Sequence, residues 1–356
     1  MDATTLQLAG DRPAPGLLGM AERGHLPDAL LRLGIRRLCT QRLQEELEGG
    51  PEAQARRFRT RMQALARGPV AEHTDAANAQ HYELPAAFFK LCLGERLKYS
   101  SCYYPNGNET LDQAEEAMLA LYLERAGLAD GQDILELGCG WGSLTLFMAE
   151  RLPGARITAV SNSRPQREYI KDQCATRGLG NVQVLTRDAN ALELPLASFD
   201  RCVSVEMFEH MHNLPTLMGR IHHWLRPGGK LFVHTFAHRT LAYPFATTGD
   251  DNWMGRHFFT GGMMPSVDTL PWCSGPLRPE SRWLVDGTHY QRTAEHWLQR
   301  QDAQRDAVMA VLDEAYGDAA ELWYQRWRMF WMACAELFGY EGGRQWMVVH
   351  HLFGRL

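Results

Sequence analysis

Short apolar runs alternate with stretches of helical length through the middle of the chain. The apolar runs are "DILELGCG", "ARITAVSNS", "VQVLTRDA", "FDRCVSVEMFE" and "GKLFVHTFA", and each is typical of a buried strand. The intervening "SLTLFMAERL" and "RPQREYIKDQCATRG" repeat apolar residues at helical spacing. Strands that alternate with helices indicate parallel pairing, because each helix carries the chain back to the start of the next strand. The pattern therefore predicts an α/β fold with a doubly wound, mostly parallel sheet.

The two ends of the chain have a mainly helical pattern. "LPDALLRLGIRRLCTQRLQEELEGG" predicts a helix with Asp28 as its N-cap and a stop at Gly49 and Gly50. "PEAQARRFRTRMQALARGP" predicts a second, polar helix that is ended by Gly68 and Pro69. "TAEHWLQRQDAQRDAVMAVLDEAYG" and "AELWYQRWRMFWMACAELFGY" predict two long helices, and "WMVVHHLFGR" predicts a closing strand.

These patterns divide the chain into five parts. The segment 237–280 is rich in glycine, proline and aromatic residues and lacks the strand–helix rhythm, which indicates an insertion or lid. The expected parts are a disordered N-terminus at 1–15, a helical region at 16–125, a Rossmann-like core at 126–236, the lid or substrate insertion at 237–280, and C-terminal helices with the final strand at 281–356.

Charge narrows the range of partners. The formal net charge of −5 gives the chain no general attraction to nucleic acid. Residues 1–70 nevertheless carry a net charge of +3, which leaves −8 for the rest. Such a segment could bind a membrane surface or a partner. It could also be a solvated helix face, and this second interpretation is favoured.

The eight cysteines are scattered along the chain. None belongs to a CxxC pair or has a metal-ligand spacing, so no metal site is predicted. The sequence shows no secretory leader and no apolar run long enough to cross a membrane. We therefore expect a cytoplasmic protein with free thiols.

A glycine turn, "ELGCGWG", follows the first strand and contains Gly138, Gly140 and Gly142. Such a turn lets a ligand approach the backbone closely at the carboxyl edge of the sheet, and a tight turn without a ligand is the alternative. The dinucleotide fingerprint is not met, because the spacing is G-x-G-x-G and the second strand ends without an acidic residue. Glu136, just before the turn, favours a cofactor with a cationic end, which points to S-adenosylmethionine.

The segment "VSVEMFEHMHN" brings Glu206, Glu209 and His210 to the end of the fourth strand, among mostly apolar residues. Buried carboxylates are costly and need a reason. Most aliphatic amines are protonated at pH 7, and methyl transfer to nitrogen needs the neutral form. Carboxylates attract an ammonium ion, and a histidine near its ordinary pKa can take its proton. The alternative is that both glutamates only accept hydrogen bonds from loop amides.

Several motifs together resemble the cyclopropane fatty acid synthase superfamily of S-adenosylmethionine-dependent methyltransferases. They are "HYELP", "YSSCYY", "LELGCGWGSLTLFMAE", "SVEMFEHM" and "FFTGGMMPS", and the resemblance spans roughly residues 15–356. The chain is most similar to the coclaurine N-methyltransferase-like branch. The resemblance implies a class I methyltransferase fold: a Rossmann-like sheet of seven strands, an N-terminal helical region that covers the cofactor site, and helical cap or lid insertions.

The resemblance also implies the cofactor contacts. Tyr99 and Ser100 would close over the methionine end of S-adenosylmethionine, whose product is S-adenosylhomocysteine. Residues 136–144 would form the cradle around it. The full expected set is Tyr99, Ser100, Glu136, Gly138, Cys139, Gly140, Gly142, Asn162 and Gln166 near the ribose, and Asp188 and Ala189 beside the adenine.

The lipid-modifying members of the superfamily supply the alternative. Their cyclopropane synthases hold a bicarbonate ion as base, and the matching positions here are Cys139, Glu209, His234 and Tyr290. These members resemble "S-V-G-x-F-E-H" at the fourth strand, so Glu206 is an extra carboxylate, as in the amine-methylating branch. Cys334 matches a cysteine once proposed as catalytic, and a core role is favoured for it.

The preferred function is N-methylation of a small, isoquinoline-like amine with deprotonation assisted by Glu206, Glu209 and His210. Cyclopropanation or C-methylation of unsaturated phospholipid is the alternative, and only that reaction requires a membrane. A regulatory protein without catalysis is disfavoured, no nucleic-acid partner is expected, and a homodimer is left open. Aromatic walls suit a flat ring and an ammonium ion, but a helical stripe of them equally suits a core. The expected pocket residues are Phe258, Phe259, His234, Tyr290, Trp327, Phe330 and Trp331.

Overall fold

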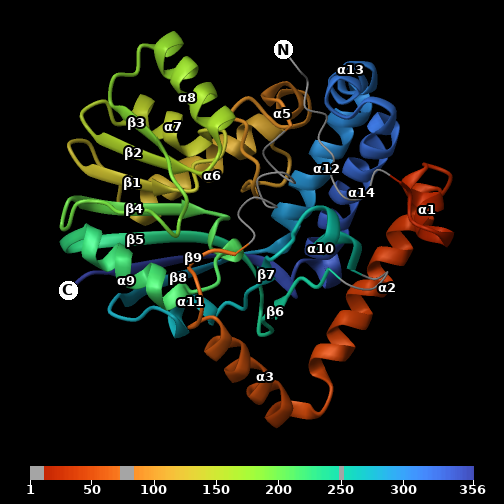
Figure 1. Ribbon diagram of the computed structural model, residues 1–356, viewed down its shortest axis with the longest axis horizontal. Coiled ribbons are helices and arrows are strands. Elements are labelled where there is room, and N and C mark those ends of the chain that lie inside the picture. Colours follow the sequence, from red (N-terminus) through yellow and green to blue (C-terminus); the bar gives the residue numbers. More distant parts are fainter. Residues whose placement is uncertain (1–11, 73–83, 248–251) are drawn as a thin grey trace.

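A seven-stranded sheet forms the centre of the protein (Figure 1). The computed structural model describes residues 12–72, 84–247 and 252–356. The strand order is β3-β2-β1-β4-β5-β9-β8, with the first five strands parallel and β9 antiparallel to both of its neighbours. The strands are β1 (Asp133–Leu137), β2 (Arg156–Ser161), β3 (Val182–Thr186), β4 (Phe199–Val205), β5 (Leu225–His238), β8 (Arg278–Val285) and β9 (Trp346–Gly354). The predicted doubly wound, mostly parallel sheet is confirmed.

Alternate residues of the central strands belong to two different cores. Ile134, Val203 and Phe232 lie in a core with α6 (Leu111–Ala126) and α7 (Ser143–Arg151). Their neighbours Leu135 and Cys202 lie in a second core with α9 (Leu214–Trp224). Successive side chains of a strand point to opposite faces, so a strand covered on both sides is apolar throughout. This is why the strands were recognisable as continuous apolar runs.

The remaining elements surround this sheet. The other helices are α1 (Gly16–Glu22), α2 (Asp28–Leu47), α3 (Gly50–Ala64), α5 (Ala86–Cys92), α8 (Arg164–Arg177), α10 (Trp253–His257), α11 (Thr269–Trp272), α12 (Gly287–Ala303), α13 (Arg305–Tyr316) and α14 (Ala320–Gly339). A small second sheet joins β6 (Tyr243–Pro244) to β7 (Met263–Met264). Within the described parts of the chain, no helix is both long and apolar enough to span a bilayer.

Two predictions from the pattern need correction, and one strand was not predicted. The helix expected from Thr293 to Gly317 is two helices, which separate at Gln304, where the backbone leaves the helical region. Asp28 is the first residue of α2 and does not cap it; its carboxylate accepts hydrogen bonds from Arg328 at 3.2 and 2.7 Å. Strand β8 was not predicted. Most of the stretch expected to be disordered, and part of the "HYELP" motif, lie outside the described residues.

The positive N-terminal region faces acidic residues of the C-terminal helices. α2 runs along α14 before the chain turns back as α3 (Figure 1). Arg32 of α2 pairs with Glu295 at 2.5 Å and with Glu336 at 2.9 Å, and Arg36 pairs with Glu336 at 2.6 Å. These arginines therefore hold two parts of the chain together, which weakens the interpretation of the region as a membrane-binding surface.

A buried ion pair anchors α1 to α14. The side chains of Glu22 and Arg326 are 0% and 1% exposed, and their oxygen and nitrogen lie 3.0 Å apart. Glu22 also accepts hydrogen bonds from the Trp253 indole and from the backbone N–H of Ala14. Burial on its own would raise the pKa of Glu22, but these donors and the charge of Arg326 keep that pKa below its usual value.

Glu22→Gln should therefore destabilise the fold markedly. It leaves the guanidinium of Arg326 buried without a counter-charge, a change that typically costs about 3–5 kcal/mol. The matched control is Asp268→Asn, which breaks an ion pair whose side chains are 64% and 45% exposed and should cost less than about 1 kcal/mol. Urea unfolding followed by circular dichroism measures both. Equal, small shifts of the two midpoints would show that the buried pair adds little.

Candidate active site

The glycine turn after β1 uses each of its glycines differently. Gly138, Gly140 and Gly142 have φ angles of 78°, 52° and 82°, in the left-handed region that favours glycine. A Cβ on Gly138 would lie 2.7 Å from Met207, and one on Gly142 would lie 2.7 Å from Ile170. A Cβ on Gly140 would meet no atom within 4 Å. The outer glycines thus allow close packing of the protein, and the middle one faces open space.

That open space belongs to a cavity at the carboxyl ends of β1, β2 and β4. We call it the central cavity; its walls include residues 97–100, 136–141, 160–162, 205–207 and 210–211. Ligands of doubly wound sheets bind at this edge. The predicted residues that line it are Tyr99, Ser100, Glu136, Gly138, Cys139, Gly140, Asn162, Gln166, Ala189, Glu206 and His210. Gly142 and Asp188 are not in its walls, although Arg187, beside Asp188, is.

The polar groups of the central cavity fit S-adenosylmethionine. Glu136 is 3% exposed and accepts a hydrogen bond from the Thr145 hydroxyl at 2.5 Å, and burial raises its pKa to about 8. A nearby cation would favour its ionised form. The amide nitrogen of Gln166 and the hydroxyl of Ser143 are buried at this cavity with no hydrogen-bond partner among the described residues. Buried polar groups are normally paired, so these suit a ligand with hydroxyl and amine groups.

Glu206 follows β4 directly in an unusual backbone conformation. Its φ is 46°, which is uncommon for any residue other than glycine. The carboxylate is 9% exposed and accepts three hydrogen bonds: from Ser101 N–H at 3.0 Å, His234 Nε2 at 3.0 Å and Tyr290 hydroxyl at 2.8 Å. Burial raises the pKa of Glu206, and the ammonium of Lys98 opposes that effect. With three donors directed at it, Glu206 is placed as a carboxylate anion at the cavity wall.

Glu209 lies below the cavity and not in its wall. It is 1% exposed, and its Oε1 accepts a hydrogen bond from Phe236 N–H at 2.8 Å. Its Oε2 has no hydrogen-bond partner in the described part of the chain. Burial, and then the charge of Glu206, raise the pKa of Glu209 well above its usual value. Burial and the charge of Glu206 thus favour the neutral form of Glu209, whereas three donors favour the charged form of Glu206.

His210 ends a single turn of 3-10 helix, Phe208–His210, and lines the cavity. Its ring stacks on Phe259 with the centroids 5.2 Å apart. The prediction that His210 has an ordinary pKa is wrong. Burial lowers the pKa of His210 to about 4, and the charge of Glu206 acts in the opposite direction. The imidazole is therefore neutral at pH 7 and able to accept a proton, but this pKa also makes it a weaker base than an exposed histidine.

His234 and Tyr290 do not line the central cavity, where they had been expected among the pocket residues. Both instead donate hydrogen bonds to Glu206 from behind the cavity wall. The resemblance to the lipid-modifying enzymes implied a role for both as bicarbonate ligands, and here a protein carboxylate takes their hydrogen bonds. Cys139, the third matching position, does line the cavity.

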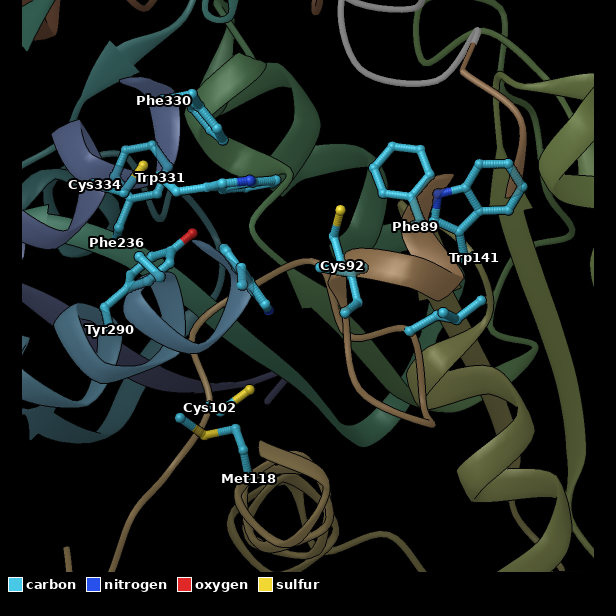
Figure 2. Packing of buried hydrophobic residues seen from close by; sticks show 14 of the residues in the cluster. Phe89, Cys92, Cys102, Met118, Trp141, Phe236, Tyr290, Phe330, Trp331 and Cys334 are labelled. Atoms are coloured by element: carbon cyan, nitrogen blue, oxygen red, sulfur yellow. The ribbon is translucent and has the colours of Figure 1, made fainter. Parts of the chain in front are cut away.

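The remaining expected pocket residues form a packed aromatic cluster. Phe258 stacks on Phe330 with the centroids 4.3 Å apart, and Trp327 lies 5.1 Å from Trp331. Neither these four nor Phe259 is in the wall of the central cavity. Figure 2 shows Phe330 and Trp331 near Tyr290 and Phe236, with Cys334 in the same cluster. Burial raises the pKa of the Cys334 thiol, which fits a core role.

One functional residue was missed entirely. Lys98 is 1% exposed, lines the central cavity, and donates hydrogen bonds from Nζ to the Ser100 hydroxyl and the Ser101 carbonyl at 2.6 and 2.5 Å. Its position directly before Tyr99 and Ser100, which were assigned to the cofactor, was the available signal. Burial lowers its pKa, and its charge favours the ionised form of Glu206.

Comparison with known proteins finds a family that covers most of the chain. The model of a family described as mycolic acid cyclopropane synthetase matches residues 71–347. The chain is 36% identical to (S)-coclaurine N-methyltransferase of Thalictrum flavum subsp. glaucum, over 95% of this chain and 94% of that protein. It is 28% identical to the cyclopropane-fatty-acyl-phospholipid synthase of Escherichia coli (strain K12), over 76% of this chain and 66% of that protein. A crystal structure of coclaurine N-methyltransferase bound to N-methylheliamine and SAH matches with a TM-score of 0.91 at 35% identity, covering 95% of this chain and 98% of that one.

Gly140→Val should abolish binding of S-adenosylmethionine, because the new side chain would occupy the space left open by the middle glycine. Gly131→Val is the matched control: Gly131 has a φ of 79° and open space around it but lies outside the cavity wall. Isothermal titration calorimetry with S-adenosylhomocysteine measures both affinities. An unchanged affinity in the Gly140 variant would place the cofactor elsewhere.

Proposed function

The chain belongs to the mycolic acid cyclopropane synthetase family, and we propose that it transfers a methyl group from S-adenosylmethionine to the nitrogen of a small amine. Two relatives that match nearly its whole length are named (S)-coclaurine N-methyltransferase. An isoquinoline-like secondary amine is therefore the proposed substrate class. The observation that carries the proposal is the Glu206 carboxyl, held by three hydrogen-bond donors, beside neutral His210 in the wall that also contains the glycine turn.

The cofactor is held by the turn and the polar groups around it. Gly140 would allow S-adenosylmethionine to approach the backbone, Glu136 would face its cationic end, and Gln166 and Asn162 would supply hydrogen bonds to its hydroxyl groups. S-adenosylmethionine, when bound, supplies a methyl group on a positively charged sulfur. The protein's contribution is to present a neutral nitrogen at that point and to exclude water, since methyl transfer depends chiefly on positioning.

The amine arrives mainly as an ammonium ion, and Glu206 is the group that attracts it. A buried carboxylate interacts more strongly with a cation than an exposed one does, because less water screens the pair. His210, neutral at pH 7, then takes the proton from nitrogen. The anion of Glu206 stabilises the imidazolium that forms, as its effect on the pKa of His210 indicates. Glu209, neutral and below the wall, supports the backbone at Phe236 and takes no proton.

The lipid-modifying alternative is disfavoured by the partners of Glu206. In that reaction a bicarbonate ion would need the hydrogen-bond donors His234 and Tyr290, and both already donate to a protein carboxylate. A fixed anion at the cavity wall also has a clear use with an ammonium ion and none with an uncharged double bond.

The parts of the chain take corresponding roles in this proposal. Residues 126–236 would bind the cofactor, 16–125 would cover it, and 237–280 with 281–356 would enclose the amine, with the aromatic cluster of Phe258, Trp327 and Phe330 on the side of the amine's ring. The eight free thiols suit the reducing cytoplasm expected from the sequence.

The substrate class is tested by offering both candidates to one preparation. With labelled S-adenosylmethionine, tetrahydroisoquinoline should be methylated, and vesicles of dioleoyl phosphatidylethanolamine and phosphatidylglycerol should stay unlabelled. Boiled enzyme supplies the background. Methyl-branched or cyclopropane acyl chains in the vesicle lipids, seen by mass spectrometry, would overturn the amine proposal.

His210→Ala should lower kcat by about 10²–10⁴-fold, the usual effect of losing a positioned base, and leave S-adenosylhomocysteine affinity nearly normal. The defect should shrink as pH rises, since more amine then arrives already deprotonated. Rates from pH 6 to 10 measure this, with the exposed His223→Ala as control.

Glu206→Gln keeps the shape of the side chain and removes its charge, so it should raise KM for the amine as well as lower kcat. Full activity of either variant at pH 7 would return both residues to a purely structural role. A His210→Ala defect of constant size at every pH would show that the imidazole only positions the amine.

A further inference from the structure

A chain of hydrogen bonds leads from Glu206 away from the cavity. His234 Nε2 lies 3.0 Å from Glu206 Oε1, and His234 Nδ1 lies 2.9 Å from His350 Nε2. His350 Nδ1 in turn lies 2.7 Å from Arg125 Nη1. His234 of β5 and His350 of β9 are directly paired across the two strands, and both are 0% exposed. Arg125, in the last turn of α6, is half-buried and lies over the ring of Trp283.

Arg125 and Glu206, at the two ends of this chain of hydrogen bonds, determine which ring nitrogen of each histidine carries a proton. Arginine only donates hydrogen bonds, so Nδ1 of His350 must be bare and its proton must lie on Nε2. His350 therefore donates to Nδ1 of His234, whose own proton lies on Nε2 and points at Glu206. An ionised carboxylate only accepts, which agrees with that direction. A second proton on His234 would set two N–H groups face to face.

Among the residues that the structure describes, Tyr122 is the one further group at this nitrogen. Its hydroxyl lies 2.8 Å from His234 Nδ1. A hydroxyl can donate or accept, so Tyr122 is compatible with either state of His234 and does not set the direction. The direction comes from Arg125 through His350.

A neutral histidine beside a buried carboxylate is the unexpected feature. A carboxylate at hydrogen-bond distance ordinarily favours the imidazolium form of a histidine. Such an ion pair would neutralise Glu206 from behind. The amine in the cavity would then meet a carboxylate whose charge is already balanced.

We propose that Arg125 and His350 are positioning residues that hold His234 in its neutral form, so that the negative charge of Glu206 stays available to the ammonium ion. The kinetic part of this inference rests on the proposed function. The structural part, the protonation state of His234, does not. Burial and nearby cations also lower the pKa of both histidines well below its usual value.

The charged and titratable groups around His234 come from several elements. His350 on β9 and Arg125 on α6 form the chain of hydrogen bonds that begins at His234. Lys98 adds a buried positive charge, which disfavours the imidazolium form of His234. The groups that face His234 or its carboxylate partner are Glu206, Lys98, Tyr122, Arg125, Tyr290, His210, Glu209 and His350. Of these groups, only His350 can do nothing but donate a hydrogen bond to His234 Nδ1, because Arg125 leaves the proton of His350 on Nε2.

The direct test follows the titration of His234 in protein labelled with nitrogen-15 at histidine. In the wild type, Nε2 should carry the proton and no second proton should bind between pH 8 and pH 5.5. His350→Leu removes the forced donor, so His234 should become protonated within that range. His350→Gln supplies an amide that can accept from Arg125 and donate to His234, and it should restore the neutral state. His234→Gln identifies the signal.

His351→Leu is the matched control. His351 is the next residue of β9, is 2% exposed and takes no part in the chain of hydrogen bonds from Glu206 to Arg125. It should leave the titration of His234 unchanged. Arg125→Gln is a second route if His350→Leu does not fold, because an amide no longer forces the direction and His234 should again gain a proton.

Kinetics with tetrahydroisoquinoline give the functional readout. As pH falls from 8 to 6, KM for the amine should rise in His350→Leu about tenfold or more beyond the wild type, the size of effect expected from losing an interaction with a charged group. His350→Gln should reverse most of that rise, and kcat at pH 8 should change little. A merely structural defect would lower kcat at every pH and would not be rescued.

The outcomes separate the two proposals. If His234 titrates alike in the wild type and in His350→Leu, or is an imidazolium in the wild type at pH 7, the inference is wrong. If the titration differs as expected but no amine is methylated, the neutral His234 stands and the proposed function fails.

Discussion

The buried carboxylate of Glu206 is the constraint on which the site depends. An ionised carboxylate away from water is strongly unfavourable unless hydrogen-bond donors replace the water. Its three donors come from the segment after α5, from β5 and from α12, through Ser101, His234 and Tyr290. The N-terminal region, the sheet and the C-terminal helices must therefore all be in place before Glu206 can be charged.

Glu206 and Glu209 show how environment separates two like groups three residues apart. Glu206 receives three side-chain or backbone donors and faces the cavity, whereas Glu209 accepts from Phe236 N–H, has one oxygen without a partner in the described part of the chain, and does not line the cavity. Two neighbouring carboxylates cannot both ionise cheaply. The charge therefore stays where the donors are. The sequence showed both glutamates as candidates, and only the geometry shows that the donors favour the charged form of Glu206 and that burial favours the neutral form of Glu209.

The parallel sheet and the glycine turn were predictable because their physical signals are local: continuous apolar runs for strands buried on both faces, and glycines at the end of the first one. β8 was missed because it is an edge strand with exposed polar residues and Pro279, which removes the apolar signal. The break at Gln304 was missed because α12 and α13 are both good helices. Trp327 and Trp331 were ambiguous, since apolar residues at helical spacing suit a core and a pocket alike. The contact of His234 with His350 joins residues 116 positions apart, and no local pattern could reveal it.

The backbone at Glu206 indicates why one substitution can change the chemistry of this family. The resemblance implies glycine at this position in the lipid-modifying members, and a φ of 46° is a conformation that glycine adopts without strain. A side chain with a Cβ costs roughly 1 kcal/mol there, so its presence calls for a compensating role. With glycine, His234 and Tyr290 would have donors free for a diffusible anion. With glutamate, the anion becomes part of the protein, permanently aligned beside the cavity. A diffusible anion that would suit a carbocation is thereby replaced by a fixed charge that suits an ammonium ion. The strand and the two donors, His234 and Tyr290, are the same in both cases.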